Sequence, residues 1–384
     1  MRPAAQRDGS RLMVLSDGRA EHRRFSDLPE YLCEGDILLL NDTRVLPVRL
    51  TGRKETGGRL EVLLVRQTEP VRRASPARET AGGDGWETCI WEVLYRGRYE
   101  GRLQINDELE LELGGEPRRR QCPDQSPQPP KSPQPPDGPR VARVSFRGDL
   151  LEIISRCGAM PLPPYIKRRP DESDRERYQT VYCRDTGHLT EGDWSPERDW
   201  SPGSIAAPTA GLHFTRELLE AIRARGVRVR KLTLHVGRGT FMPVRCNDIR
   251  EHPMEREHFE IGRALVDEIN ETRRAGGRLC AVGTTATRAI EGYFSGRCRL
   301  DKKPGGDGTI SGSTDIFIYP GYPFRAVDAL VTNFHLPRST PLMLASALAG
   351  RQTLLKAYEE AVRAGYRFFS YGDAMLISDG KKCF

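Results

Sequence analysis

The sequence lacks the motifs that mark several large classes of protein. None of its nine cysteines belongs to a C-x-x-C pair, so the spacing typical of a structural zinc site is missing. No segment matches G-x-x-x-x-G-K-[ST] or G-x-S-x-G, which argues against a phosphate-binding P-loop and against a serine hydrolase. Gly237 and Gly239 lack the third glycine of a dinucleotide-binding fingerprint. None of these common chemistries is therefore indicated.

Long apolar runs are missing as well. The stretches 37–40 and 342–349 are too short or too mixed to cross a bilayer, which takes about 20 apolar residues. No positively charged segment followed by an apolar one opens the chain, so a signal peptide is not expected. We predict a cytoplasmic protein without a membrane segment.

One short segment, 252–258, is rich in potential metal ligands. Pro253 interrupts a helical presentation of these side chains, and the spacing matches no zinc motif. We therefore expect no metal.

Charge leaves the partner open. The chain carries 60 Lys and Arg against 53 Asp and Glu, a formal net charge of +7. A positive surface suits a polyanion such as RNA, because each neutralised phosphate releases counterions. A general abundance of arginine explains the same excess equally well.

Two kinds of sequence pattern occur along the 384 residues, a length that suits two domains. Residues 48–150 contain runs of β-type alternation separated by glycines, which predicts a small antiparallel β-barrel domain. Residues 1–47 and 151–384 are predicted to form an α/β catalytic domain that the barrel interrupts. From about residue 204 onward strands and amphipathic helices alternate, which favours a mainly parallel sheet. Thr215 is predicted to cap one of these helices, and Thr340 is predicted to cap another, with Pro341 as its first residue.

Four segments have the composition of solvated loops, and we assign them no function. They are 68–85, the Pro-rich and Gln-rich 115–140, 184–202 with its repeated Asp-Trp-Ser-Pro, and 296–313.

Ligands of an α/β sheet gather where strands lead into helices. Four such loops, 206–214, 235–241, 283–285 and 332–337, are rich in glycine and polar residues. The turn 283–285 suits a carboxylate or phosphate, because a helix N-terminus presents free N–H groups, although an ordinary tight turn has the same composition. Three of the seven histidines also lie on these loops, and histidine titrates near neutral pH. They are His213, His235 and His335.

Taken together, the sequence resembles the S-adenosylmethionine:tRNA ribosyltransferase-isomerase family along nearly its whole length. The matching stretches are Leu38–Pro47, Met160–Arg168, Glu176–Tyr182, Ala206–Phe214, Leu232–Val244, Ala281–Arg288, Phe317–Gly321, Val331–Pro337 and Tyr366–Ile377.

The resemblance implies an unusual reaction. The ribose of S-adenosylmethionine is transferred to 7-aminomethyl-7-deazaguanine at the wobble position of tRNA and is rearranged to an epoxycyclopentane. Adenine and methionine leave, and the product is epoxyqueuosine. The expected partners are this tRNA and S-adenosylmethionine, with no cofactor beyond S-adenosylmethionine as co-substrate, and a monomer is favoured.

The reaction needs a base for the attacking amine and a stabiliser for the departing adenine. The catalytic candidates are His213, His235, His335 and Asp373, without individual roles. The candidates for substrate binding are Arg44, Pro208, Thr209, Gly211, Gly237, Thr240, Phe241, Gly283, Thr284, Thr285, Arg288, Asn333 and Phe334.

Two departures from the family pattern are evident. Family members usually have a further N-terminal stretch before the region that begins here at Arg7, and they usually have His where this chain has Glu255. Two other function classes are weighed: a conventional S-adenosylmethionine-dependent RNA methyltransferase and a non-catalytic RNA-binding module. A methyltransferase needs a glycine-rich loop after an early strand and an acidic residue at the end of the next strand, which we do not find in the sequence. An RNA-binding module would be expected to have a denser basic or aromatic surface than this chain offers.

Overall fold

A computed structural model describes residues 2–73, 85–114, 140–184, 203–237, 239, 244–246, 248–301 and 308–378. The chain forms two compact units. The first contains Met1–Val45, Leu162–Thr186 and Gly203–Phe384, and the second is built around Leu46–Pro161.

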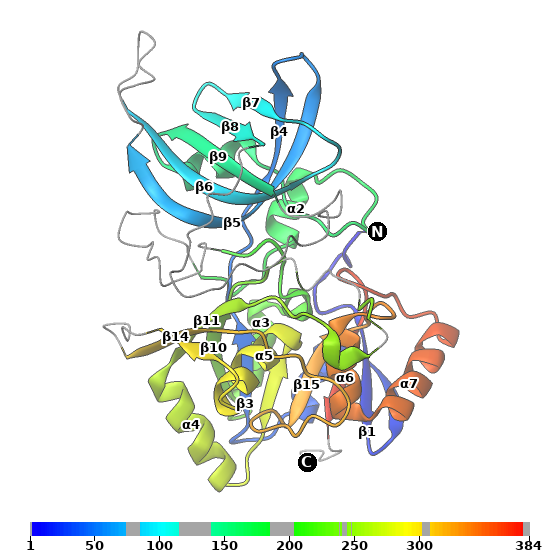
Figure 1. Ribbon diagram of the computed structural model, residues 1–384. Helices are drawn as coiled ribbons and strands as arrows, with labels where there is room; N and C mark the ends of the chain where they lie inside the picture. The colour runs from blue at the N-terminus through cyan, green and yellow to red at the C-terminus, as the bar shows by residue number, and fades with distance from the viewer. Residues whose placement is uncertain are drawn as a thin grey trace. The chain divides into compact units, whose positions relative to one another are not determined.

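The first unit is built on a ten-stranded sheet of order β13-β14-β11-β10-β3-β12-β15-β16-β1-β2 (Figure 1). The strands are β1 (Arg11–Ser16), β2 (Arg19–Arg24), β3 (Ile37–Asn41), β10 (Arg228–Leu234), β11 (Glu257–Gly262), β12 (Leu279–Val282), β13 (Arg299–Leu300), β14 (Thr309–Thr314), β15 (Ala329–Asn333) and β16 (Ala374–Ser378). The central strands β10, β3, β12 and β15 are parallel neighbours. Antiparallel pairs flank them on both sides, so the sheet is mixed and is parallel mainly at its centre.

The centre of the sheet is buried on both faces, because β12 and residues 37–40 of β3 are apolar at every position. Along β3, Ile37 and Leu39 join one core cluster, whereas Leu38 and Leu40 join another. Successive side chains of a strand point to opposite faces, so a continuous apolar run requires cover on both sides.

The helices of the first unit are η1 (Phe25–Tyr31), α2 (Glu172–Arg177), η4 (Thr209–His213), α3 (Arg216–Ala224), η6 (Ile249–Glu251), α4 (Arg263–Arg274), α5 (Gly283–Phe294), α6 (Thr340–Ala349) and α7 (Arg351–Arg363). All of these except α2 and η6 contribute apolar side chains to the two core clusters and so cover the sheet. Thr215 caps α3 as predicted, accepting a hydrogen bond from the Leu218 amide at 3.1 Å. The predicted cap of α6 is wrong by one residue, because Ser339 occupies that position and Thr340 begins the helix. Both residue types cap helices well, so composition did not distinguish them.

The second unit is a closed antiparallel barrel of order β4-β5-β6-β9-β8-β7. Its elements are β4 (Arg49–Lys54), β5 (Arg59–Arg73), β6 (Trp86–Tyr95), β7 (Gly101–Asn106), β8 (Leu109–Leu113), β9 (Arg140–Arg147) and helix α1 (Leu150–Cys157). Alternate residues of β8, Leu109, Leu111 and Leu113, are buried, as expected for side chains that fill a small barrel. Gly52 is required by packing, since a Cβ there would lie 2.6 Å from Leu103 Cγ.

The predicted fold class, an α/β domain with an inserted antiparallel β-barrel, is confirmed. Within the described residues, no helix has the length and apolar character that a bilayer crossing requires. Of the four segments interpreted as solvated loops, 115–139 and 185–202 lie outside the described residues.

Candidate functional site

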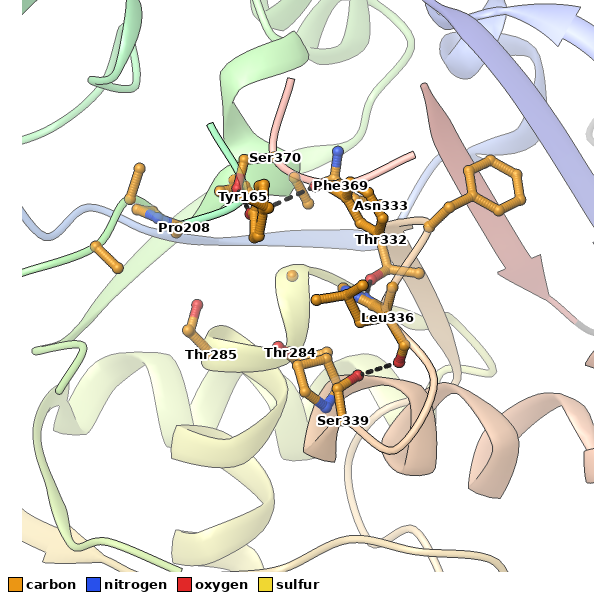
Figure 2. A pocket seen from close by; sticks show the side chains of 18 of the residues that line it. Tyr165, Pro208, Thr284, Thr285, Thr332, Asn333, Leu336, Ser339, Phe369 and Ser370 are labelled. Atoms are coloured by element: carbon orange, nitrogen blue, oxygen red, sulfur yellow. Dashed lines mark hydrogen bonds between the residues drawn. The ribbon is translucent and has the colours of Figure 1, made fainter. Parts of the chain in front are cut away.

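The first unit contains a cavity of about 410 Å³ at the carboxyl ends of the neighbouring parallel strands β12 and β15. Three of the predicted loops meet there: 206–210, the start of α5, and the segment that follows β15 (Figure 2). The lining includes eight of the predicted residues: Pro208, Thr209, Gly283, Thr284, Thr285, Asn333, Phe334 and His335. This is the edge of an α/β sheet at which ligands bind.

Two further segments complete the wall and were missing from the predicted site. Tyr165 and Ser370 lie together on the upper side of the cavity in Figure 2, joined by a hydrogen bond between their hydroxyl groups. The ring of Phe369 lies 5.0 Å from that of Tyr165. Both segments belong to stretches that resemble the family, but a hydroxyl or aromatic residue within such a stretch carries no signal of its own. Only the fold brings them to this cavity.

Phe369 has an unusual backbone conformation. Its φ is +73°, in the left-handed region that a bulky residue rarely adopts. Its amide donates to the Phe334 carbonyl at 2.9 Å, which ties the loop to the end of β15. Strain of this kind persists where the surroundings enforce it and is common in ligand sites.

Asp373 holds the loop that carries Phe369 and Ser370, and it does not line the cavity. Its carboxylate accepts hydrogen bonds from the Arg367 amide at 2.8 Å and the Arg11 amide at 3.1 Å, and it pairs with both guanidinium groups at 3.0 Å. Burial alone raises the pKa of this carboxyl, but the hydrogen bonds from Arg367 and Arg11 outweigh it and hold the pKa below its ordinary value. Asp373 is therefore an anion that braces the loop.

His213 lies behind the cavity wall. Asn333 Nδ2 donates to His213 Nε2 at 3.0 Å, so the imidazole Nδ1 carries the proton and faces Ser10 Oγ at 2.7 Å. Asn333 Oδ1 in turn accepts from Thr209 Oγ1 at 3.0 Å. Burial lowers the pKa of His213 to about 4, and the ring is stacked on Phe25. This chain of hydrogen bonds fixes the orientation of Asn333 in the cavity.

His335 is the predicted catalytic candidate that lines the cavity directly. Its Nε2 lies 2.7 Å from Thr332 Oγ1, and its backbone amide donates to the Tyr358 hydroxyl at 2.9 Å. Burial lowers the pKa of the imidazole to about 4. The ring is therefore neutral at pH 7 and can accept a proton.

His235 belongs to a different group, which we call the histidine cluster: the buried His235 and His258 with the half-buried Glu260 and Arg184. Ligand atoms of the first three lie within 4.8 Å of one another. The Arg184 guanidinium lies 2.6 Å from the Glu260 carboxylate and 3.3 Å from His235 Nε2. Burial, then repulsion from His258 and Arg184, lowers the pKa of His235 well below its ordinary value. The cluster already contains a cation, which opposes the binding of a metal ion.

Arg288 and Gly237 adjoin this region and do not line the cavity. The Arg288 guanidinium forms a buried ion pair with Glu257 and donates to the Ile316 carbonyl. The Gly237 amide donates to the other carboxylate oxygen of Glu257 at 3.1 Å.

The remaining predicted binding residues are placed elsewhere or lie outside the described part. Gly211 is buried in η4, where a Cβ would lie 2.0 Å from the Tyr182 hydroxyl, so packing explains this glycine. The Arg44 carbonyl accepts from the Ser204 amide at 2.8 Å. Thr240 and Phe241 lie outside the described residues.

Comparison with known proteins identifies the family. The sequence matches the family described as "Queuosine biosynthesis protein" over residues 1–377. A protein from Thermodesulfovibrio yellowstonii named S-adenosylmethionine:tRNA ribosyltransferase-isomerase is 45% identical over 378 residues, covering 98% of this chain and 95% of that protein. A protein of the same name from Desulforamulus reducens is 44% identical over 378 residues, covering 98% and 94%.

One solved structure is also similar in sequence. The crystal structure of S-adenosylmethionine tRNA ribosyltransferase from Thermotoga maritima is 32% identical, covers 98% of this chain and 95% of that chain, and has a TM-score of 0.46. Because the family match and the identities extend over nearly the whole length, the chain belongs to the queuosine biosynthesis protein family.

Proposed function

We propose that this protein is an S-adenosylmethionine:tRNA ribosyltransferase-isomerase that binds S-adenosylmethionine in the cavity at β12 and β15. It transfers the ribosyl group to 7-aminomethyl-7-deazaguanine at the tRNA wobble position and isomerises it, giving epoxyqueuosine-tRNA, adenine and methionine. The observation that carries the proposal is the cavity itself, since eight residues predicted from the sequence line it. Its volume suits a ligand of this size.

The lining suits a sulfonium ligand. The aromatic rings of Tyr165 and Phe369 offer π-faces to a cation. Within the described lining there is no Asp or Glu, so the sulfonium is not held by a carboxylate that competes as a nucleophile. The sulfonium supplies its own activation, and the proposed reaction needs no cofactor beyond S-adenosylmethionine as co-substrate.

His335 is our candidate for the base that deprotonates the attacking amine. It lines the cavity, and its depressed pKa keeps the imidazole neutral, although it also makes the base weak. His213 acts through Asn333 as a positioning residue, and Asn333 offers an amide to the departing adenine.

The acceptor in this proposal is a whole tRNA or its anticodon arm, bound by a monomer. The cytoplasm, where tRNA is modified, is the expected compartment.

Product analysis tests the proposal. The protein is incubated with S-adenosylmethionine and tRNA that carries the aminomethyl-deazaguanine. Free adenine and methionine in equal amounts support the proposal. S-adenosylhomocysteine would support a methyltransferase instead, and an unchanged co-substrate would support an RNA-binding module.

A further inference from the structure

The N-terminus of α5 lies at the cavity wall, and its first amide groups have no side-chain acceptor among the described residues. No side chain caps the helix at Val282, and the first turn contains no acidic residue. The first turn of an α-helix leaves its N–H groups without intrahelical acceptors. Gly283, with φ of +85°, allows β12 to pass directly into the helix and brings these groups to the cavity wall.

A second donor lies beside these groups. Thr285 is only 6% exposed and lines the cavity, yet its hydroxyl has no hydrogen-bond partner among the residues that the structure describes. In Figure 2 this hydroxyl points away from helix α5. A buried hydroxyl without a partner is costly, so its presence indicates a polar ligand atom that is absent from the protein alone.

From this geometry we infer that the start of α5, with Thr284 and Thr285, binds the carboxylate of the methionyl group of S-adenosylmethionine. The inference rests on the proposed function. Amide groups at a helix N-terminus and a hydroxyl donor together form an anion site that requires no lysine or arginine. A phosphate has the same chemistry, but a phosphate within an RNA backbone cannot reach a group as buried as the Thr285 hydroxyl as readily as the end of a small molecule can.

The test compares two ligands and two variants by isothermal titration. The ligands are S-adenosylmethionine and its decarboxylated analogue, the tRNA anticodon arm is titrated in addition, and the variants are Thr285→Val and Thr287→Val. Thr287 is the matched control, because it lies on the same helix but its hydroxyl donates to the Gly283 carbonyl at 3.1 Å. Thr285→Val should weaken S-adenosylmethionine binding about tenfold and leave binding of the analogue unchanged. Thr287→Val should change neither affinity.

The other outcomes are distinct. Equal weakening of both ligands by Thr285→Val would overturn the carboxylate assignment alone. An unchanged affinity for S-adenosylmethionine with weaker binding of the tRNA anticodon arm would assign the site to phosphate and overturn the inference. If the unmodified protein bound neither ligand, the proposed function would fail together with this assignment.

A separate hollow of about 500 Å³ in the first unit combines arginines with aromatic rings. Its arginines are Arg250, Arg256, Arg297 and Arg299. Arg250 pairs with Asp248 and Arg256 with Asp315, but within the described residues the exposed Arg297 and Arg299 form no ion pair. The rings of His252 and Phe317 lie 5.2 Å apart, and those of Phe317 and Tyr319 lie 5.3 Å apart.

We propose that this arginine hollow binds the backbone and an unpaired base of the tRNA substrate. This proposal also rests on the proposed function. Guanidinium groups bind phosphates, and a row of aromatic rings offers stacking surfaces to bases, the combination typical of single-stranded RNA sites. Arg297 and Arg299 form no ion pair with any described residue, so a phosphate could bind them without displacing a described carboxylate.

The test measures binding of the anticodon arm by Arg299→Glu and by the control Arg351→Glu, an exposed arginine at the start of α7. Arg299→Glu should weaken binding about tenfold or more and reduce its salt dependence, because one phosphate contact is lost. S-adenosylmethionine binding should be unchanged. If Arg299→Glu and Arg351→Glu weakened binding equally and only slightly, binding would depend on the overall charge of the protein alone, and the assignment would be overturned. If Arg299→Glu lost affinity for an acidic protein but kept its affinity for the anticodon arm, the tRNA assignment would be overturned in favour of a protein partner.

Discussion

The cavity and the histidine cluster arise from the same kind of loop, yet they differ in how their polar groups are satisfied. Around His235 the charges are paired within the protein, as Arg184 with Glu260 and Arg288 with Glu257. In the cavity, the first amide groups of α5 have no side-chain cap, and the Thr285 hydroxyl has no partner within the described part of the chain. A paired group of charges is already complete, whereas open donors can bind the acceptor atoms of a ligand. Loop composition predicts both regions, and they differ only in whether their polar groups have hydrogen-bond partners.

The largest expected effect is on stability, near the histidine cluster. Arg288→Met leaves the Glu257 carboxylate buried without its cation, so the free energy of unfolding should fall by about 3–5 kcal/mol. Denaturant titration measures this. Adenine release per folded molecule should change little, and the exposed control Arg297→Met should retain its stability. A stable Arg288→Met protein without activity would instead place Arg288 among the substrate-binding residues.

The second effect is on pH dependence. Burial lowers the pKa of His213 and His335 to about 4, below the value of about 6.5 in the unfolded chain. The unfolded state therefore takes up the proton first. Stability is complete above pH 6.5 and falls as the pH drops toward 4, by about 3 kcal/mol for each histidine. Unfolding of the His335→Gln variant between pH 7 and 4 should show a shallower fall than that of the unmodified protein, and an identical slope would contradict a buried neutral His335.

The third effect is on turnover in the cavity. His335→Ala should slow adenine release by about a hundredfold or more if His335 is the base. The control His22→Ala removes a partly exposed histidine that binds Glu360 and should retain turnover. His235→Ala should lose thermal stability, with activity falling only in proportion. A hundredfold loss in His235→Ala with normal melting would reverse the roles of the two regions.

A smaller effect tests the chain from His213 to the cavity. His213→Ala and Asn333→Ala should each slow adenine release by roughly tenfold, and the double variant should be little slower than either, because both act through one hydrogen bond. Effects that add fully would show that the two residues work independently.

The smallest effect concerns residues 115–139, which lie outside the described residues. Their Pro-rich and Gln-rich composition cannot form a core, so replacing them with a short turn should leave melting temperature and turnover nearly unchanged. A marked loss of activity would show that this segment has a function.

The fold could be predicted further than the site. Sequence patterns along strands and helices are local, so the alternation in β8 indicated the barrel, and the alternation of strands with amphipathic helices after residue 204 indicated the α/β domain. The lining of the cavity depends on contacts between distant segments, such as Tyr165 with Ser370, which no local pattern contains. The three histidines His213, His235 and His335 were predicted to share one site because they lie on similar loops. In the structure they differ in their burial and in their hydrogen-bond partners. The pairing of Arg288 with Glu257 was hidden for the same reason.

A crystal structure of the protein with S-adenosylmethionine bound tests the distinction between the two regions most directly. We expect the co-substrate in the cavity, with its carboxylate within hydrogen-bond distance of the Thr285 hydroxyl and its sulfonium near the rings of Tyr165 and Phe369. Density for S-adenosylmethionine beside His235, with the cavity empty, would contradict it.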